Sequence, residues 1–298
     1  MKRQAGFSLI EVAVAVSLLT LLAGLGLQVW RASSQLSATI DTRNKLDQVQ
    51  SALQSFFRTN GRLPCPDTTA NPTGIEPATC TTLASGYGVV PWASLGIPKS
   101  AVLDGWSNFF TYRVSVSSPA AAAPAAPLVP RAANNLQNWA QRNLVPPPNA
   151  GFNIGSLTSP NTGGFRAIQV DERNAGIVST SAFHAVATLV SHGPSGAGAR
   201  TSNGVLMALP PAGSDELVNA SASNPPRVVI RSFTDSTAAV GGVYDDIVVY
   251  LTPQNLLQPL LDDKSLRGIC NAYCPSPPGA AGCSATGIPV GNATMICP

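Results

Sequence analysis

The sequence predicts an α+β fold in which one long N-terminal helix packs on an antiparallel β-sheet, with long loops and a disulfide-rich C-terminal tail. Two observations carry this prediction. A helical pattern extends from about residue 7 to 59, and the second half of the chain contains segments rich in β-branched and aromatic residues. The length of 298 residues favours one elaborated domain, and 26 glycines and 26 prolines indicate long loops.

The helix begins with an apolar segment at residues 7–30, in which Glu11 is the one charged residue. A helix of this length can cross the hydrocarbon core of a bilayer, which is about 30 Å thick. Lys2 and Arg3 precede it, and because positive charge stays on the cytoplasmic side, the rest of the chain is expected on the outer side. The segment starts directly after Gly6, without the polar spacer and small-residue cleavage site of an ordinary secretory signal.

Glu11 stands out because an ionised carboxylate inside an apolar helix costs about 2.5–3.5 kcal/mol on insertion scales. Cleavage between Gly6 and Phe7 would create a new α-amine at the edge of the same helix. That amine would lie roughly 6 Å along the axis from Glu11, because a helix rises about 1.5 Å per residue. A neighbouring subunit shifted along the axis can supply the amine more easily. The sequence therefore predicts side-by-side assembly of these helices.

The stretch GFSLIE at residues 6–11, followed by an apolar helix, resembles the processing site of the type IV pilin and type II secretion pseudopilin superfamily. The resemblance implies that a prepilin peptidase cleaves after Gly6 and N-methylates Phe7, and that Glu11 guides the addition of subunits. It also implies that the chain crosses the bacterial inner membrane once, holds its head in the periplasm and joins other pilins or pseudopilins in a filament. A plain signal anchor with an incidental Glu11 is the alternative.

The expected units follow from this order. They are a leader at 1–6, a transmembrane helix at 7–30, its periplasmic continuation at 31–59 and a globular head at 60–298 with a low-complexity insertion near 117–151. The continuation is amphipathic, because its apolar residues recur mostly at three- and four-residue steps. These residues are Leu36, Ile40, Leu46, Val49, Leu53, Phe56 and Phe57. Asn60, Gly61 and Pro64 are expected to end the helix.

In the head, residues 61–98 are expected to form a loop, and residues 104–116 a turn followed by a strand. This turn and strand resemble those of pseudopilins, which implies a structural role. The matching residues are Asp104, Trp106, Asn108, Phe110 and Tyr112. The alanine- and proline-rich insertion contains one possible helix at 131–144.

Four further segments are expected to be strands of an antiparallel sheet, because they are rich in β-branched and aromatic residues and are separated by loops. They are FRAIQV, FHAVATLVS, RVVIRSF and VYDDIVVYLT. Residues 191–199 and 244–257 also resemble stretches of larger pseudopilin-like proteins of Gram-negative bacteria.

The sequence does not favour an enzyme. His184 and His192 are the two histidines, and the glycines around Ser195 do not have the spacing of a nucleophile elbow, so Ser195 is expected to serve a turn. Asp245 and Asp246 are weak candidates for a hard cation such as calcium, because few other acids lie nearby in the sequence. One exposed carboxylate and one that caps a turn are expected instead. No metal or cofactor is predicted. Nucleic acid is not predicted either, because a protein that binds it usually has a clustered basic face, and a net charge of +3 does not indicate one.

Six cysteines follow the apolar segment, and an even count in an oxidising compartment indicates disulfides. Proximity in the sequence favours a bond between Cys65 and Cys80. Two further bonds are then expected among Cys270, Cys274, Cys283 and Cys297. The alternative is a zinc site formed by the four tail cysteines, but their spacing lacks paired C-x-x-C knuckles.

Two functions of different classes fit these features. The first is a structural subunit, a minor pilin or pseudopilin, that sits below the tip or along the shaft of a filament. The second is a binding module, in which the large head is a pilus-tip adhesin or cargo receptor on the same anchor. The sequence leaves open whether the machine secretes proteins, builds pili or takes up DNA.

Overall fold

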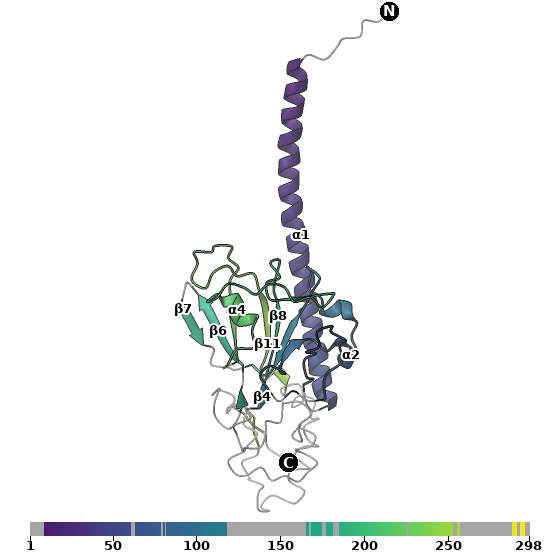
Figure 1. Cartoon of the computed structure of the whole chain (residues 1–298), viewed down its shortest axis with the longest axis vertical. Helices are drawn as coiled ribbons and strands as arrows, with labels where there is room; N and C mark the ends of the chain where they lie inside the picture. The colour runs from purple at the N-terminus through teal and green to yellow at the C-terminus, as the bar shows by residue number, and fades with distance from the viewer. Residues whose placement is uncertain are drawn as a thin grey trace, which may run out of the picture.

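The computed structural model of the chain consists of a long helix and a head of two packed β-sheets (Figure 1). It describes residues 9–60, 63–78, 80, 82–117, 165–166, 168–174, 177–180, 185–224, 226–252, 255–256, 288–290 and 293–295. The possible helix at 131–144 and the four tail cysteines lie outside these residues, as does nearly all of the predicted insertion. The domain boundaries drawn from the sequence remain predictions.

Helix α1 (Leu9–Asn60) is one continuous element of 52 residues, which agrees with the predicted helix end near residue 59. Its second half packs into the head through a stripe at four- and three-residue steps. The buried side chains of this stripe are Thr42, Leu46, Val49, Leu53 and Phe57. Leu36 and Ile40 were predicted to continue the same face, but both are exposed. The described part of the head reaches α1 from about Gln35 onward, and Gly105 lies against the helix backbone at Ala38.

The central sheet has four strands in the order β1-β3-β8-β11, all antiparallel to their neighbours. The strands are β1 (Tyr87–Val89), β3 (Thr111–Val114), β8 (Ala187–Ser191) and β11 (Ile247–Leu251). Three of them fall inside segments predicted as strands. The fourth, β1, lies in a stretch predicted to be loop, together with the short helix α2 (Trp92–Leu95). A 3-10 turn, η1 (Lys99–Val102), follows directly after that stretch.

A second sheet of three strands, in the order β10-β6-β7, packs on the far side of the central sheet (Figure 1). Its strands are β6 (Gln169–Asn174), β7 (Ile177–Thr180) and β10 (Arg227–Arg231). Strands β6 and β7 are antiparallel, whereas β10 pairs with β6 in parallel. The prediction of a purely antiparallel sheet was therefore wrong at β10. The connection from β7 to β10 passes through β8 of the other sheet, and this long crossover permits a parallel pair.

The central sheet is consequently covered on both faces. Leu189 and Leu251 point to the core that contains α1, while Val190 and Val248 point to the second sheet. Every residue of β3 is buried, including the polar Thr111 and Arg113. The alternation of aromatic and polar residues in β3 predicted a strand, but its polar side faces a second layer rather than water.

The remaining elements are short. They are β2 (Asn108–Phe109) paired with β9 (Arg200–Thr201), β4 (Val116–Ser117) paired with β5 (Phe165–Arg166), β12 (Ile288–Val290) paired with β13 (Ala293–Met295), and helix α4 (Asp215–Asn219). Ser214 caps α4 by accepting a hydrogen bond from the Leu217 amide. Helix α4 lies against β10 and carries an acidic side chain toward the junction of the two sheets.

Candidate functional site

The N-terminal half of α1 projects beyond the head (Figure 1). We define residues 9–21 as the apolar stem. Its exposed apolar side chains are Leu9, Ile10, Val12, Val14, Val16, Leu18, Leu19 and Leu21. Large exposed apolar patches mark sites of contact with proteins or membranes. The stem therefore has the character of a contact surface.

Glu11 lies in the first turn of α1, exposed among the apolar side chains of the stem. A carboxylate is favourable at this end of a helix because the N-terminus carries partial positive charge. Gly6 and Phe7, the predicted cleavage and methylation residues, lie outside the described residues. Among the helices within the described ranges, we find none that has both the length and the apolar character needed to span a membrane. The span predicted at 7–30 is thus not confirmed.

The turn at residues 104–108 fastens the head to α1. Asp104 is buried, and its Oδ1 accepts hydrogen bonds from the amides of Trp106 and Asn108, each at 2.9 Å. Its Oδ2 accepts a 2.8 Å bond from Ser191 Oγ at the end of β8. The Gly105 amide donates to Thr42 Oγ1 of α1 at 2.9 Å. These contacts give the aspartate of the predicted turn a structural role.

Gly105 also explains why this turn approaches the helix so closely. A Cβ atom at this position would lie 2.4 Å from the Ala38 carbonyl oxygen and 2.6 Å from the Ala38 Cα. Those atoms are helix backbone, which cannot move aside easily. Trp106 completes the contact, because its Nε1 donates to Gln35 Oε1 at 3.1 Å. The turn therefore marks the boundary between the covered and the uncovered halves of α1.

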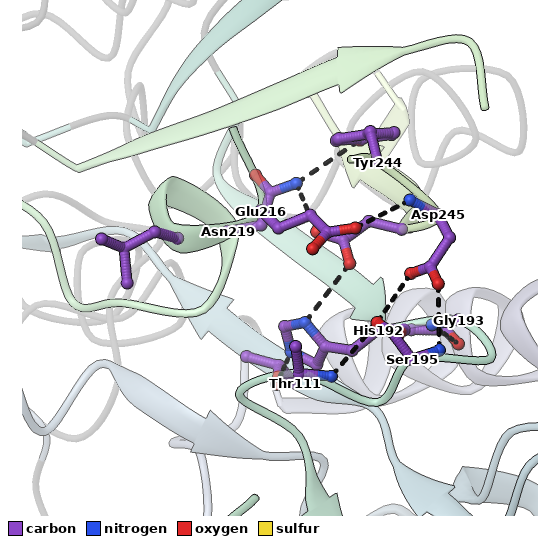
Figure 2. A network of polar contacts seen from close by, with 12 residues as sticks. Thr111, His192, Gly193, Ser195, Glu216, Asn219, Tyr244 and Asp245 are labelled. Atoms are coloured by element: carbon purple, nitrogen blue, oxygen red, sulfur yellow. Dashed lines mark hydrogen bonds and ion pairs between the residues drawn. The ribbon is translucent and has the colours of Figure 1, made fainter. Parts of the chain in front are cut away.

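Four ionisable side chains meet where the two sheets join, and we call them the junction cluster: His192, Glu216, Asp245 and Asp246. Figure 2 labels the first three of them. His192 directly follows β8, and Asp245 and Asp246 directly precede β11. Because Ser191 pairs with Ile247, the antiparallel register brings the next residues of both strands together. Glu216 comes from α4, and oxygen atoms of the three carboxylates lie within 4.8 Å of one another.

Hydrogen bonds hold most of the cluster in place (Figure 2). The Asp245 amide donates to Glu216 Oε1 at 2.9 Å, and Asn219 Nδ2 donates to Asp246 Oδ2 at 2.8 Å. The pKa of Glu216 is raised to about 7, chiefly by burial. The neighbouring carboxylates of Asp246 and Asp245 contribute to this rise, and the bond from the Asp245 amide opposes it. Burial also raises the pKa of Asp245. Three carboxyl groups are therefore held close together at this junction, in surroundings that disfavour their charged forms.

Thr111, His192 and Asp246 form a hydroxyl–imidazole–carboxylate chain. Thr111 Oγ1 lies 2.8 Å from His192 Nε2, and His192 Nδ1 lies 3.5 Å from Asp246 Oδ1. This order is that of a catalytic triad. Thr111 is 6% exposed and His192 is 0% exposed, so a substrate has no access to the hydroxyl in this conformation. The geometry gives no support to nucleophilic catalysis, and the absence of enzymatic activity stays a prediction.

Ser195 serves the turn at residues 193–196, as the sequence predicted, and Asp245 caps this turn. Asp245 Oδ2 accepts from the Ser195 amide at 2.9 Å, and Ser195 Oγ lies 3.1 Å from Asp245 Oδ1. Gly193 has a φ of 55° and leaves space for the Asp245 backbone, since a Cβ there would lie 2.4 Å from the Asp245 carbonyl oxygen. The expectation of one exposed carboxylate in this pair was wrong, because Asp245 is half-buried and Asp246 is buried.

The structure contains a disulfide between Cys65 and Cys80, the pair that proximity favoured, and both residues are part of the main core. The four tail cysteines, Cys270, Cys274, Cys283 and Cys297, lie outside the described residues, as does His184, so the two bonds expected in the tail stay predictions.

Sequence reasoning missed His192 and Glu216 as members of one cluster. The signal for His192 was its position directly after a predicted strand.

Comparison with known families gives one match. Residues 1–27 match the model of the prokaryotic N-terminal methylation motif. No curated protein and no solved structure matches the chain. The motif indicates processing by a prepilin peptidase, assembly with other pilins and a membrane-anchored precursor. At its N-terminus the chain therefore carries the methylation motif that is characteristic of type IV pilins and pseudopilins.

Proposed function

We propose that this chain is a structural minor pilin or pseudopilin, anchored in the bacterial inner membrane with its head in the periplasm. After cleavage at Gly6 and methylation of Phe7, it joins a type II secretion pseudopilus or a type IV pilus below the tip or along the shaft. The observation that carries the proposal is the methylation motif at residues 1–27, which continues into a helix with an exposed apolar stem.

The stem supports assembly because its apolar surface is not covered by the described part of the head. Lipid covers such a surface before assembly, and the stems of neighbouring subunits cover it afterwards. Glu11 adds a directional interaction. Two opposite charges about 4 Å apart interact by roughly 4 kcal/mol at an effective dielectric of 20, comparable to the 2.5–3.5 kcal/mol of placing one carboxylate in lipid. Pairing with the α-amine of a neighbour's Phe7 therefore favours the filament over the bilayer.

Processing is tested by mass spectrometry of the protein purified from its native membrane. The expected N-terminal peptide starts at N-methylated Phe7. A peptide that retains Met1, or that starts at another residue, contradicts the proposed processing.

Assembly is tested with Glu11→Gln, which preserves size and hydrogen-bonding capacity but removes the charge. We expect normal cleavage but loss of crosslinking and co-purification with the other pilins. The matched control is Asp41→Asn, an exposed acid on the same helix whose carboxylate pairs with Lys45 at 2.6 Å. This control is expected to assemble normally. Wild-type incorporation of Glu11→Gln would refute the pairing mechanism and favour a subunit held by its head alone.

A further inference from the structure

The junction cluster contains three carboxyl groups that have no lysine or arginine partner among the described residues. Within the described residues, no lysine or arginine forms an ion pair with Glu216, Asp245 or Asp246. The contrast with Asp215, the neighbour of Glu216 on α4, is informative. Asp215 forms ion pairs with both Arg173 and Arg231, at 2.7 and 2.8 Å. Of the two adjacent acids on α4, Asp215 therefore has its charge balanced by arginines, whereas Glu216 has no such partner among the described residues.

The centre of the cluster also holds two buried polar atoms that make no hydrogen bond. They are His192 Nδ1 and Asp246 Oδ1, which face each other at 3.5 Å. The side chains of both residues are at most 1% exposed. Buried polar atoms almost always have a partner, so each exception requires an explanation. An ion pair between the two requires a protonated imidazole and still leaves a distance too long for a hydrogen bond.

The spacing of the carboxylates fits one bound cation. Their oxygen atoms lie within 4.8 Å of one another, close to twice a metal–oxygen distance of about 2.0–2.6 Å. A single ion can therefore contact all three carboxylates after small side-chain adjustments. His192 lies outside this group of oxygen atoms and adjoins it through Nδ1, 3.5 Å from Asp246 Oδ1. Asp245 is half-buried, which leaves the cluster one side open to solvent for entry.

The donor set indicates the class of cation. Mg²⁺ and Ca²⁺ favour all-oxygen sites, and Ca²⁺ takes six to eight oxygens. An imidazole nitrogen beside carboxylates suits first-row transition metals, including Zn²⁺, which binds both His nitrogen and Asp or Glu oxygen. Thr111 Oγ1 contacts the other ring nitrogen of His192, in the manner of the groups that orient metal-binding histidines.

We propose that His192, Glu216, Asp245 and Asp246 bind one divalent transition-metal cation, such as Mn²⁺ or Zn²⁺, that links β8, β11 and α4. The cation satisfies the two buried atoms and compensates the three carboxylates. Its role is structural, because the ligands come from the end of β8, the start of β11 and the helix beside β10. The cation holds the second sheet against the central sheet. Its binding does not depend on the proposed processing at Gly6.

The test uses the purified full-length protein, treated with a chelator and then titrated with MnCl₂ in a calorimeter. Mn²⁺ is the first probe because cysteine sulfur, a soft ligand, prefers other metals. We expect one Mn²⁺ per chain, a rise in the unfolding temperature on binding, and the same site occupied by Zn²⁺ in a second titration. No saturable binding of either ion would overturn the proposal.

Variants assign the ligands. Glu216→Gln keeps the acceptor for the Asp245 amide, and Asp246→Asn keeps an oxygen for Asn219, so both are expected to fold. Each is expected to weaken Mn²⁺ binding at least tenfold, as is His192→Gln. Asp235→Asn changes an exposed acid that precedes β11 and should leave binding unchanged. Wild-type affinity in Asp246→Asn would overturn the site.

A titration with CaCl₂ separates the two classes of cation. Tight binding of one Ca²⁺ that Mn²⁺ does not displace, with no effect of His192→Gln, would overturn the assignment of imidazole as a ligand. Circular dichroism of each variant establishes that it is folded before its affinity is compared. If His192→Gln unfolds, the comparison of Mn²⁺ with Ca²⁺ in Glu216→Gln and Asp246→Asn still decides the proposal.

Discussion

The two halves of helix α1 differ both in apolar content, which is higher in the N-terminal half, and in what covers them. In the head-facing half, Phe57 is 1% exposed within the main core, whereas Leu9 in the stem is 88% exposed. A continuous helix therefore contains one surface that the described head buries and one that it leaves exposed. The difference teaches that burial within the head accounts for the stability of the fold, while the stem is the surface to which the proposed function assigns assembly.

The largest expected effect comes from removing a core side chain from the head-facing half. Phe57→Ala should lower the free energy of unfolding by about 3–5 kcal/mol, because it leaves a cavity between α1 and the central sheet. Leu18→Ala, at a stem position that is 54% exposed, should change it by less than about 0.5 kcal/mol. Urea unfolding followed by near-UV circular dichroism measures both. Equal losses would show that the stem packs on the chain itself.

The next effect concerns the boundary between the two halves. Gly105→Ala places a methyl group against the backbone of Ala38 and should cost about 1–3 kcal/mol, as overpacking typically does. Gly96→Ala serves as a control, because its φ of 71° is strained for alanine but its new methyl group meets nothing within 4 Å. The control should cost about 1 kcal/mol. If Gly105→Ala costs no more than the control, the close approach to α1 does not constrain this position.

The sequence was sufficient to predict the long helix and several strands, but not β1, β7 and α4, nor all of the pairings between strands. The ends of α1 and the segments containing β3, β8, β10 and β11 follow from local periodicity, which depends on residues close together in the chain. The parallel pairing of β10 with β6 and the burial of Thr111 and Arg113 depend on a second layer, which local periodicity does not encode. A polar alternation cannot distinguish a face covered by another layer from a face in water.

The junction cluster illustrates the same limit. His192 follows one predicted strand, and Asp246 lies in another, so a single register of antiparallel pairing would have placed them together. The register of two strands could not have predicted that Glu216 joins them, because Glu216 lies on the short helix α4, whose position depends on its contact with β10. By contrast, the motif at residues 1–27 is local and could be read directly from the sequence.

A pH dependence is expected at the turn that begins the covered half. Burial raises the pKa of Asp104 above 3.8, although the bonds from Asn108, Ser191 and Trp106 oppose the shift. The folded state therefore retains this proton when the unfolded state has lost it, and stability falls as the pH rises from about 3.8 through the folded pKa. Asp104→Asn removes this contribution, so the difference in unfolding free energy between the two proteins should change across that interval. A constant difference would contradict the raised pKa.

The smallest effect is expected at Ser107, the residue in the same turn with a positive φ of 68°. This conformation costs a residue with a Cβ about 1–2 kcal/mol, whereas glycine adopts it freely. Glycine also gives the unfolded chain more freedom, which offsets roughly 0.5–1 kcal/mol of that gain. Ser107→Gly should therefore stabilise the head by about 0.5 kcal/mol.

Ser107→Ala separates the backbone effect from any contribution of the hydroxyl, because alanine keeps the Cβ and the strain but loses the oxygen. The side chain of Ser107 is exposed, and its amide and carbonyl bond to Asp104 and Ser202 through the backbone, which every variant retains. Ser107→Ala should therefore match the wild type in urea unfolding, while Ser107→Gly should exceed it. If both variants lose stability equally, the hydroxyl rather than the backbone determines this position, and the turn holds α1 through a side-chain contact of Ser107.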